Sequence, residues 1–218
     1  MHLNTDTKLF LGVGIVTVLL IGVASIFLTR GQATPKLDKP SVDTKVLIRE
    51  DSESQSTPSA RFTLVEFADF QCPSCGSVHP LVKDLLARYK GNLNYVFRHF
   101  PLDQHPNAVS AAIASEAAAD QDTFWEMHDI LFTNQSEWSE ESDPNTQFKS
   151  YAKELKLNMT KFNKAITEKL HKDKIDRDVS DGKSIGVNST PTFFLNGQRM
   201  TNFADIEKII KSELAVKK

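Results

Sequence analysis

The only two cysteines of this 218-residue chain lie within one tetrapeptide, Cys72-Pro73-Ser74-Cys75. An apolar run from Phe62 to Phe70 precedes them and predicts a buried strand, and the stretch from Gly76 to Tyr89 predicts a helix. Two thiols at this spacing can close into a disulfide and reopen, so the pair can store two electrons. A dithiol at a strand-to-helix turn indicates a redox site.

The bulk composition leaves the cysteines free for chemistry. A domain of roughly 150 residues buries enough surface to be stable without disulfide bonds. The formal charge of −2 and the pI near 6.3 give no reason to expect nucleic-acid binding. Thiol–disulfide exchange needs no bound group, so we expect no cofactor and no metal.

The amino-terminal region has a different composition. Residues 9–28, from Leu9 to Leu28, contain no charged side chain, and as a helix they would span about 30 Å, the thickness of a bilayer core. We therefore expect a transmembrane anchor after a short segment of residues 1–8. A cleaved signal sequence is the alternative, with Gly31-Gln32-Ala33 as the cleavage region.

The charges around this apolar run and the redox chemistry predict opposite sides of the membrane for the domain. Lys8 stands before the run, whereas Arg30, Lys36 and Lys39 follow it, a balance that would leave the domain in the cytosol. Disulfides persist in oxidising compartments, and long domains translocate with little regard to nearby charge. We therefore expect the domain on the extracytoplasmic side, in the periplasm or at the outer face of the cell membrane.

Residues 29–60 read as a polar tether, within which Lys45–Arg49 is a candidate edge strand, and residues 61–218 as one domain. The run Asn94–Phe100 predicts its second strand, and residues 106–182 predict a helical insertion. Asn196-Gly197 between two short apolar runs predicts a hairpin, and a helix from Phe203 to Val216 closes the chain. This order of elements predicts an α/β fold.

The two cysteines are predicted to have different roles. Cys72 would lie at the amino end of the helix, where Pro73 takes the first helical position and free N–H groups favour a thiolate. That thiolate would attack, and Cys75 would resolve the mixed disulfide. The alternatives are an inert disulfide and half of a zinc site, for which His79 is the nearest further ligand. We expect His79 instead to be a partly exposed helix residue.

Glu66 is predicted to point into the core. Alternate residues of a strand share one face, so Glu66 shares its face with Leu64 and Ala68. Burial raises the pKa of a carboxylate, and Glu66 would then exchange protons with Cys75. The alternative is that the strand twists and Glu66 reaches solvent. Asp69 falls on the opposite face, as a surface or capping residue.

Other polar residues carry less information. Thr190-Pro191 precedes an apolar run, and most X–Pro bonds in folded proteins are trans. His99 and His105 could be mistaken for a catalytic or metal cluster, but their place between a strand and a helix favours loop and packing roles. His128, in Phe124–His128, is expected to belong to a core helix.

Together these stretches resemble the DsbA-like thiol–disulfide oxidoreductases, specifically their membrane-anchored, BdbD-like group. The resemblance covers the chain from about Arg61 to its end, through the stretches Val65–Cys75, Arg98–Leu102 with His105-Pro106, Phe124–His128 and Gly186–Gly197. Several ordered motifs are far more specific than a single CxxC.

The resemblance implies a thioredoxin-like fold with a helical insertion. It also implies that Pro191 is cis and packs against the cysteines, that the backbone at Thr190 pairs with a substrate peptide, and that Glu66 is the family's buried acid. Between the cysteines, Pro73 and Ser74 would tune the potential. The family's strongest oxidants often carry histidine at the position of Ser74, so the oxidising power of this chain is open.

The expected function is the donation of disulfides to secreted or membrane proteins by a monomeric enzyme. Because there is no third cysteine, a membrane partner of the DsbB or BdbC kind would reoxidise the pair. One rival is a disulfide reductase of the same fold, for example in cytochrome maturation. Another is a non-catalytic chaperone or metal-carrying module.

Overall fold

The computed structural model describes residues 42–216. The expected anchor, the segment before it and the first part of the tether lie outside this range, so the structure does not address them. Within residues 42–216, no helix is long and apolar enough to cross a membrane.

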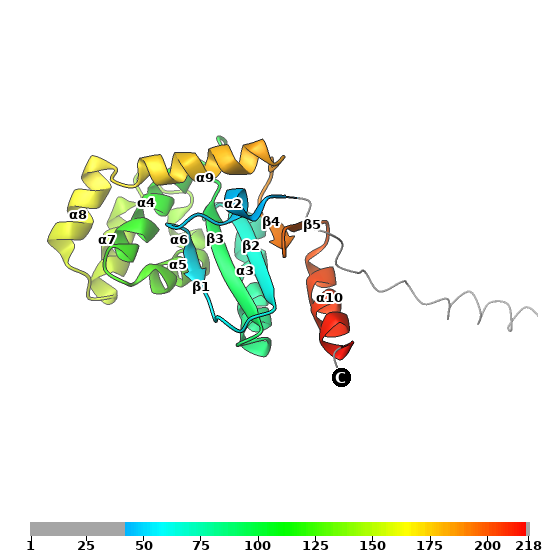
Figure 1. Cartoon of the computed structure of the whole chain (residues 1–218). Helices are drawn as coiled ribbons and strands as arrows, with labels where there is room; N and C mark the ends of the chain where they lie inside the picture. The colour runs from blue at the N-terminus through cyan, green and yellow to red at the C-terminus, as the bar shows by residue number, and fades with distance from the viewer. Residues whose placement is uncertain (1–41, 217–218) are drawn as a thin grey trace, which may run out of the picture.

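A mixed five-stranded sheet forms the centre of the domain (Figure 1). Its strands run in the order β1-β3-β2-β4-β5, where only β2 and β3 are parallel to one another. Their bounds are β1 Glu53–Gln55, β2 Phe62–Ala68, β3 Leu93–His99, β4 Thr192–Leu195 and β5 Gln198–Met200. Helix α3, Pro73–Arg88, joins the parallel pair, because parallel neighbours need a long crossover connection.

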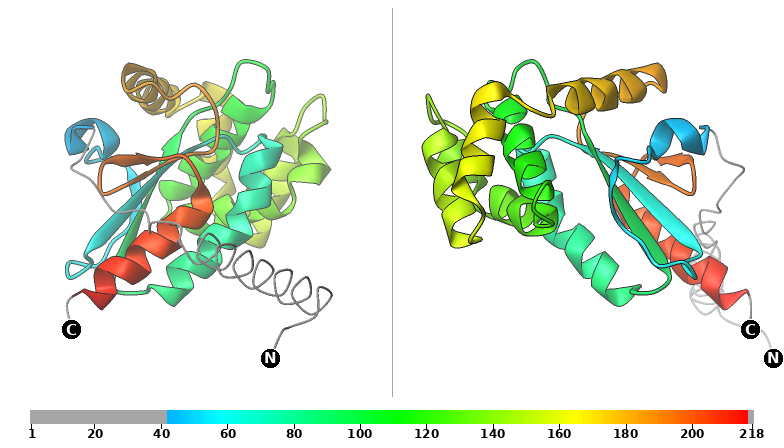
Figure 2. Two further views of the ribbon diagram at one scale, coloured as in Figure 1. Left: turned by 90° about the vertical axis from the view of Figure 1, so that its right-hand side faces the viewer. Right: turned by 60° about the vertical axis from the view of Figure 1, so that its left-hand side comes forward.

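Helices cover both faces of the sheet (Figure 2). On one face, α3 and the carboxyl-terminal α10, Phe203–Ala215, pack against side chains such as Leu64 and Phe193. On the other, α2, Thr44–Leu47, and α9, Lys172–Ser184, cover a smaller cluster that contains Val65. Because successive strand residues face opposite sides, this two-sided burial gives β2 and β4 almost unbroken apolar sequences.

The predicted helical insertion lies between β3 and β4. It consists of α4 Ala108–Ala119, α5 Phe124–Thr133, α6 Gln135–Trp138, α7 Asn145–Glu154, α8 Met159–Glu168 and α9. Figure 1 shows α4 to α8 gathered at one end of the sheet, with α9 returning over it toward β4. Trp138 and Phe148 are fully buried inside this helical group. The α/β fold with a helical insertion is thus confirmed.

The segment before residue 61 differs from the expected tether. Lys45–Arg49 is not an edge strand, because Asp43 caps a short helix there by accepting a hydrogen bond from the backbone of Lys45 at 2.9 Å. Leu47 of that helix is buried in the core, and the true edge strand is β1, which pairs with β3. The packed domain therefore begins before Arg61.

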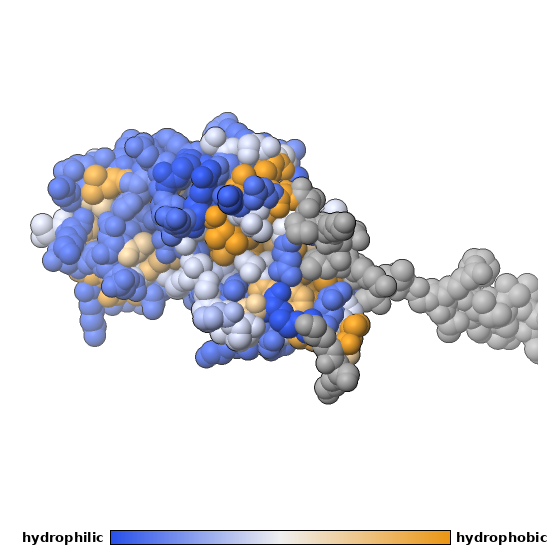
Figure 3. All heavy atoms as spheres, viewed as in Figure 1, coloured by the Kyte–Doolittle hydropathy of each residue, from blue (hydrophilic) through white to orange (hydrophobic). Residues whose placement is uncertain are grey.

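The surface viewed in Figure 3 is mainly hydrophilic over the helical insertion, where apolar spots are small, and the larger apolar areas lie nearer the sheet. Large hydrophobic side chains that are exposed are few among the described residues: Ile48, Leu81, Leu170 and Val216.

The predicted hairpin is present, with Asn196 (φ 48°) and Gly197 (φ 82°) both in the left-handed region that a two-residue turn of this type demands.

Candidate active site

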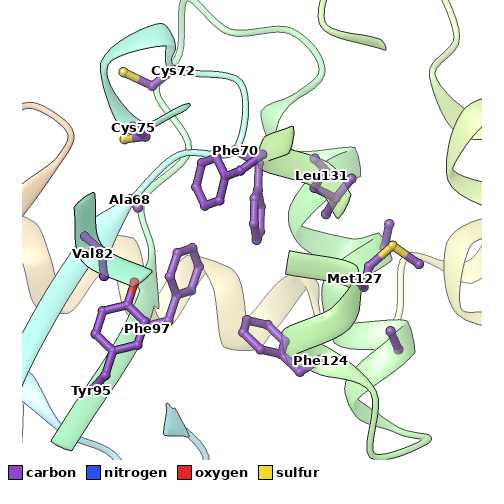
Figure 4. Close-up of a cluster of buried hydrophobic side chains, with 14 of the residues drawn as sticks. Ala68, Phe70, Cys72, Cys75, Val82, Tyr95, Phe97, Phe124, Met127 and Leu131 are labelled. Carbon is purple, nitrogen blue, oxygen red and sulfur yellow. The ribbon is translucent and has the colours of Figure 1, made fainter. Parts of the chain in front are cut away.

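Cys72 lies at the amino end of α3, directly before Pro73. No side chain caps this helix end, so its free backbone N–H groups face the Cys72 sulfur. Cys72 is 6% exposed and Cys75 is fully buried, although both are free thiols in the structure. Figure 4 shows the two sulfurs at the edge of the apolar core, beyond Ala68 and Phe70.

The two thiols differ strongly in acidity. A hydrogen bond from Cys75 and the backbone N–H groups of Cys75 and Ser74 lower the pKa of Cys72 to about 5. Burial raises the pKa of Cys75 well above its ordinary value, and the neighbouring charges of Cys72 and Glu66 raise it further. At neutral pH, therefore, Cys72 is the thiolate and Cys75 keeps its proton.

Glu66 lies inside the core on the face that strand parity predicts. It is 3% exposed and belongs to the same face as Leu64 and Ala68. Its Oε2 accepts a hydrogen bond of 2.5 Å from the hydroxyl of Tyr95 on β3. Burial raises the pKa of Glu66 to about 7, with the Tyr95 hydrogen bond acting in the opposite direction. Glu66 can thus gain or lose a proton near neutral pH.

The Thr190-Pro191 peptide bond is cis and lies beside the cysteines. The Sγ of Cys72 is 3.5 Å from the backbone oxygen of Thr190, a contact in which only the protonated thiol can donate a weak hydrogen bond. The structure therefore brings together, from positions far apart in the sequence, the dithiol and the loop that precedes β4.

Two glutamine side chains support the cysteine loop. Gln135 of α6 donates from Nε2 to the backbone oxygens of Phe70 at 2.6 Å and Cys72 at 3.0 Å. Gln71 accepts from the backbone N–H of Asn107 and donates to the oxygen of Ser139. No sequence signal marks these glutamines, because their partners belong to other segments.

Asp69 was expected as a surface or capping residue; it is not at the surface, but it does cap backbone N–H groups. It is 1% exposed, and its carboxylate accepts hydrogen bonds from the backbone N–H groups of Gln71 and Leu102 and from Nδ1 of His105 at 2.6 Å. Asp69 therefore ties the cysteine loop to the loop after β3. The strand ends at Ala68, so parity no longer determines which way Asp69 points.

His99 and His105 do not converge on one site. His99 Nε2 lies 2.7 Å from Glu116 in the core, whereas His105 belongs to the Asp69 network. Both contacts agree with the packing roles that the sequence indicates. His79 is buried rather than partly exposed, since its ring stacks on Phe132 of α5.

Comparison with known proteins settles the family. The family model described as thioredoxin matches residues 53–212. The chain belongs to the thioredoxin family. This thioredoxin-like domain includes β1 and all the elements through most of α10, so the match covers the helical insertion as well as the sheet.

Solved structures show the same fold. BdbD from Bacillus subtilis, in its oxidised form, superposes with a TM-score of 0.67 at 23% identity and covers 84% of this chain and 98% of its own. Wolbachia pipientis α-DsbA1 gives 0.65 at 23% identity over 78% and 96%. The catalytic domain of Proteus mirabilis ScsC gives 0.63 at 17% over 79% and 94%. The thioredoxin-like domain thus has the fold of the DsbA-like proteins.

Curated relatives in sequence carry another name. An Na(+)/H(+) antiporter NhaA 3 of Salinispora tropica is 39% identical over 170 residues, which make up 77% of this chain and 25% of the antiporter. An antiporter NhaA of Herminiimonas arsenicoxydans is 33% identical over 175 residues, or 80% and 26%. The thioredoxin-like chain spans about a quarter of the length of these relatives, so their name describes proteins much larger than this domain.

Proposed function

We propose that this protein is a thiol–disulfide oxidoreductase that introduces disulfide bonds into extracytoplasmic proteins. The observation that carries the proposal is the opposite acidity of the two thiols, with a stabilised thiolate at Cys72 and a buried, protonated Cys75. A stabilised thiolate favours the reduced form of the enzyme, and its disulfide is correspondingly oxidising.

The proposed reaction begins from the Cys72–Cys75 disulfide. A substrate thiolate attacks the Sγ of Cys72, the S–S bond breaks, and Cys75 leaves as a thiolate that takes a proton from Glu66. A second substrate thiolate then attacks the substrate sulfur of the mixed disulfide, and Cys72 leaves as a stabilised thiolate. The substrate loses two electrons and gains a disulfide, and the enzyme pair gains those two electrons.

Glu66 is suited to this proton transfer. Its pKa of about 7 means that both protonation states are populated near neutral pH, and its charge acts on Cys75. Proton transfer is most efficient for a group whose pKa lies near the working pH. Pro73 and Ser74 would adjust the stability of the Cys72 thiolate, because the backbone N–H of Ser74 is one of its donors.

The substrate would bind beside Thr190 and Pro191. The Thr190 carbonyl lies against the Cys72 sulfur, so a peptide that pairs with this backbone places its own sulfur in position to exchange. We propose secreted or membrane proteins with paired cysteines as substrates, bound by a monomeric enzyme. The apolar run of residues 9–28 supports a membrane anchor, and the lack of a third cysteine supports a membrane redox partner of the DsbB or BdbC kind.

The decisive experiment is a redox titration of the purified protein against glutathione. We expect a reduction potential above about −180 mV, in the direction of DsbA at about −120 mV. A value near that of thioredoxin, about −270 mV, would show instead that the same residues serve a disulfide reductase.

The variant Cys72→Ser distinguishes a redox enzyme from a non-catalytic binding module. The variant should lose all oxidation of a reduced substrate protein, whereas Ser74→Ala, which keeps both thiols, should retain it. Continued oxidation by Cys72→Ser would show that the dithiol is not the redox centre.

A further inference from the structure

A second cluster of chemically active side chains lies on the seam between α3 and α5. His79 comes from α3, and His128 and Asp129 come from α5. They line a pocket of about 370 Å³ whose wall also includes Lys83 and Tyr95. The cysteines are not part of this cluster, and the mechanism above does not use it.

The spacing of the donor atoms suits one small cation. Asp129 Oδ1 lies 3.5 Å from His79 Nε2 and 3.1 Å from His128 Nδ1, and all three donor atoms lie within 4.8 Å of one another. Metal–ligand bonds of 2.0–2.1 Å at tetrahedral angles place neighbouring donors about 3.3 Å apart. Small side-chain movements are therefore enough to bring all three onto one ion.

The donor set is one that binds transition metals. His79 and His128 are buried and offer imidazole nitrogens, and Asp129 offers a carboxylate oxygen. The cluster thus offers two nitrogen ligands and one oxygen ligand.

The surroundings of His128 add an independent argument. Its ring is caged by the aromatic rings of Phe70, Phe97 and Phe132, and its Nε2 has no hydrogen-bond partner among the described residues. A leucine would fill such a cage without a desolvation penalty. Among the described residues, the one polar partner of this buried imidazole is therefore Asp129, which lies at its Nδ1 atom.

We propose that His79, His128 and Asp129 bind one divalent transition-metal ion of the zinc type, with water from the pocket as the remaining ligand. Two imidazoles and one carboxylate suit zinc far better than calcium or magnesium, which prefer oxygen ligands. Lys83, which pairs with Asp129 and is 55% exposed, has room to move away. The bound ion joins the cysteine-bearing helix to the helical insertion.

The sequence does not predict this site, and from it we expect no metal. The metal sites considered from the sequence lie beside the cysteines and at His99 and His105, whereas His79 and His128 come together only when α5 packs on α3. The proposal is independent of the redox function, because none of the three proposed ligands belongs to the redox site, although Tyr95 of the pocket wall also donates to Glu66.

The test uses the full-length protein with Cys72 and Cys75 oxidised to the disulfide, confirmed by the absence of reactive thiol, so that neither sulfur competes for metal. Titration with Co²⁺ should load one ion per chain, with the visible bands of four-coordinate cobalt and without sulfur-to-cobalt charge transfer. Zn²⁺ should displace it stoichiometrically and raise the thermal unfolding midpoint.

His79→Gln and Asp129→Asn should each weaken Zn²⁺ binding at least tenfold. The matched control is His171→Gln, which removes a similar histidine–carboxylate pair with Asp120 on the surface and should leave binding unchanged. If His79→Gln fails to fold, Asp129→Asn carries the test, since Asp129 is 35% exposed. Absence of stoichiometric Co²⁺ binding, or equal binding by wild type and Asp129→Asn, would overturn the proposal.

Discussion

Two ionisable side chains, Glu66 on β2 and Arg98 on β3, are both buried in the middle of the sheet. They lie at adjacent register positions and therefore point to opposite faces. Glu66 is opposite Phe97, and Arg98 is opposite Phe67. Among residues 42–216, Glu66 has a single hydrogen-bond partner, the neutral hydroxyl of Tyr95. Arg98 donates to the carboxylates of Asp178 and Asp181 and to two backbone oxygens at the end of α2.

The difference shows that burial by itself does not decide how an ionisable side chain behaves. A buried carboxylate without a cation shifts its pKa toward neutrality and becomes able to exchange protons. A buried guanidinium with two carboxylates instead forms a hydrogen-bonded network that holds α2, β3 and α9 together. The face with the cysteines therefore carries the titratable group, and the opposite face carries the structural network.

The strongest test of this contrast is Arg98→Met. The change leaves Asp178 buried without its cationic partner, and we expect a loss of about 3–5 kcal/mol in the free energy of unfolding. Urea denaturation would measure it. Arg177→Met, which removes an exposed pair with Asp51, should cost less than about 1 kcal/mol. Equal losses in both variants would mean that the buried network has no special structural role.

Glu66→Gln should change stability in a pH-dependent way. The pKa of Glu66 rises from 4.5 in the unfolded chain to about 7 in the folded protein. Its contribution is thus fully present below pH 4.5 and is lost as the pH rises through 7, a loss of about 3 kcal/mol. Glutamine does not titrate, so the oxidised variant should lack this decline when unfolding is measured at about pH 5 and about pH 8.

A companion variant should show the opposite sign. Burial favours the neutral form of Glu116, but hydrogen bonds and charges from His99 and Lys174 outweigh it and lower the pKa of this carboxyl. Glu116→Gln should therefore lose stability above pH 4.5 rather than gain it.

In the reduced enzyme, Glu66→Gln should also alter the pH dependence of Cys75 alkylation. Parallel pH profiles for wild type and Glu66→Gln would remove Glu66 from the mechanism.

Two helical glycines allow the packing of the two faces to be compared. A Cβ on Gly182, in α9, would lie 2.8 Å from the ring of Phe100 and 3.1 Å from that of Phe67, so Gly182→Ala should cost about 1–3 kcal/mol. A Cβ on Gly76, in α3, would lie 2.8 Å from Oε1 of Gln135, so this amide must shift and its hydrogen bonds to the oxygens of Phe70 and Cys72 weaken. That cost of about 1 kcal/mol is offset by the better helix propensity of alanine. Gly76→Ala should therefore stay within about 1 kcal/mol of wild type by urea denaturation. The reverse order would contradict this difference in packing.

The smallest expected effect is that of Tyr95→Phe. Loss of the hydrogen bond that stabilises the ionised carboxylate should raise the pKa of Glu66 further above 7, by about one pH unit. The pH dependence of Cys75 alkylation would report the change. Tyr151→Phe removes a tyrosine–glutamate hydrogen bond in the helical insertion and should leave that profile unmoved.

Much of the fold followed from local patterns. Strand and helix runs predicted β2, α3, β3 and the closing helix to within a few residues, and Asn196-Gly197 predicted the hairpin because only certain residues tolerate its backbone angles. Alternation along β2 placed Glu66 in the core. The edge strand predicted at Lys45 is wrong because a four-residue helix is too short to show a period, and tertiary contacts hold it in place: burial of Leu47 and hydrogen bonds from Arg98.

The sequence by itself determined the redox pair, its position before a helix and the direction in which Glu66 points, because these depend on neighbours along the chain. Only the tertiary structure decided which side chains meet: Tyr95 with Glu66, Gln135 with the cysteine loop, and the Thr190 carbonyl with Cys72. The pKa differences that separate the two thiols arise from these contacts and from burial. Both depend on how distant segments pack, which no local pattern encodes.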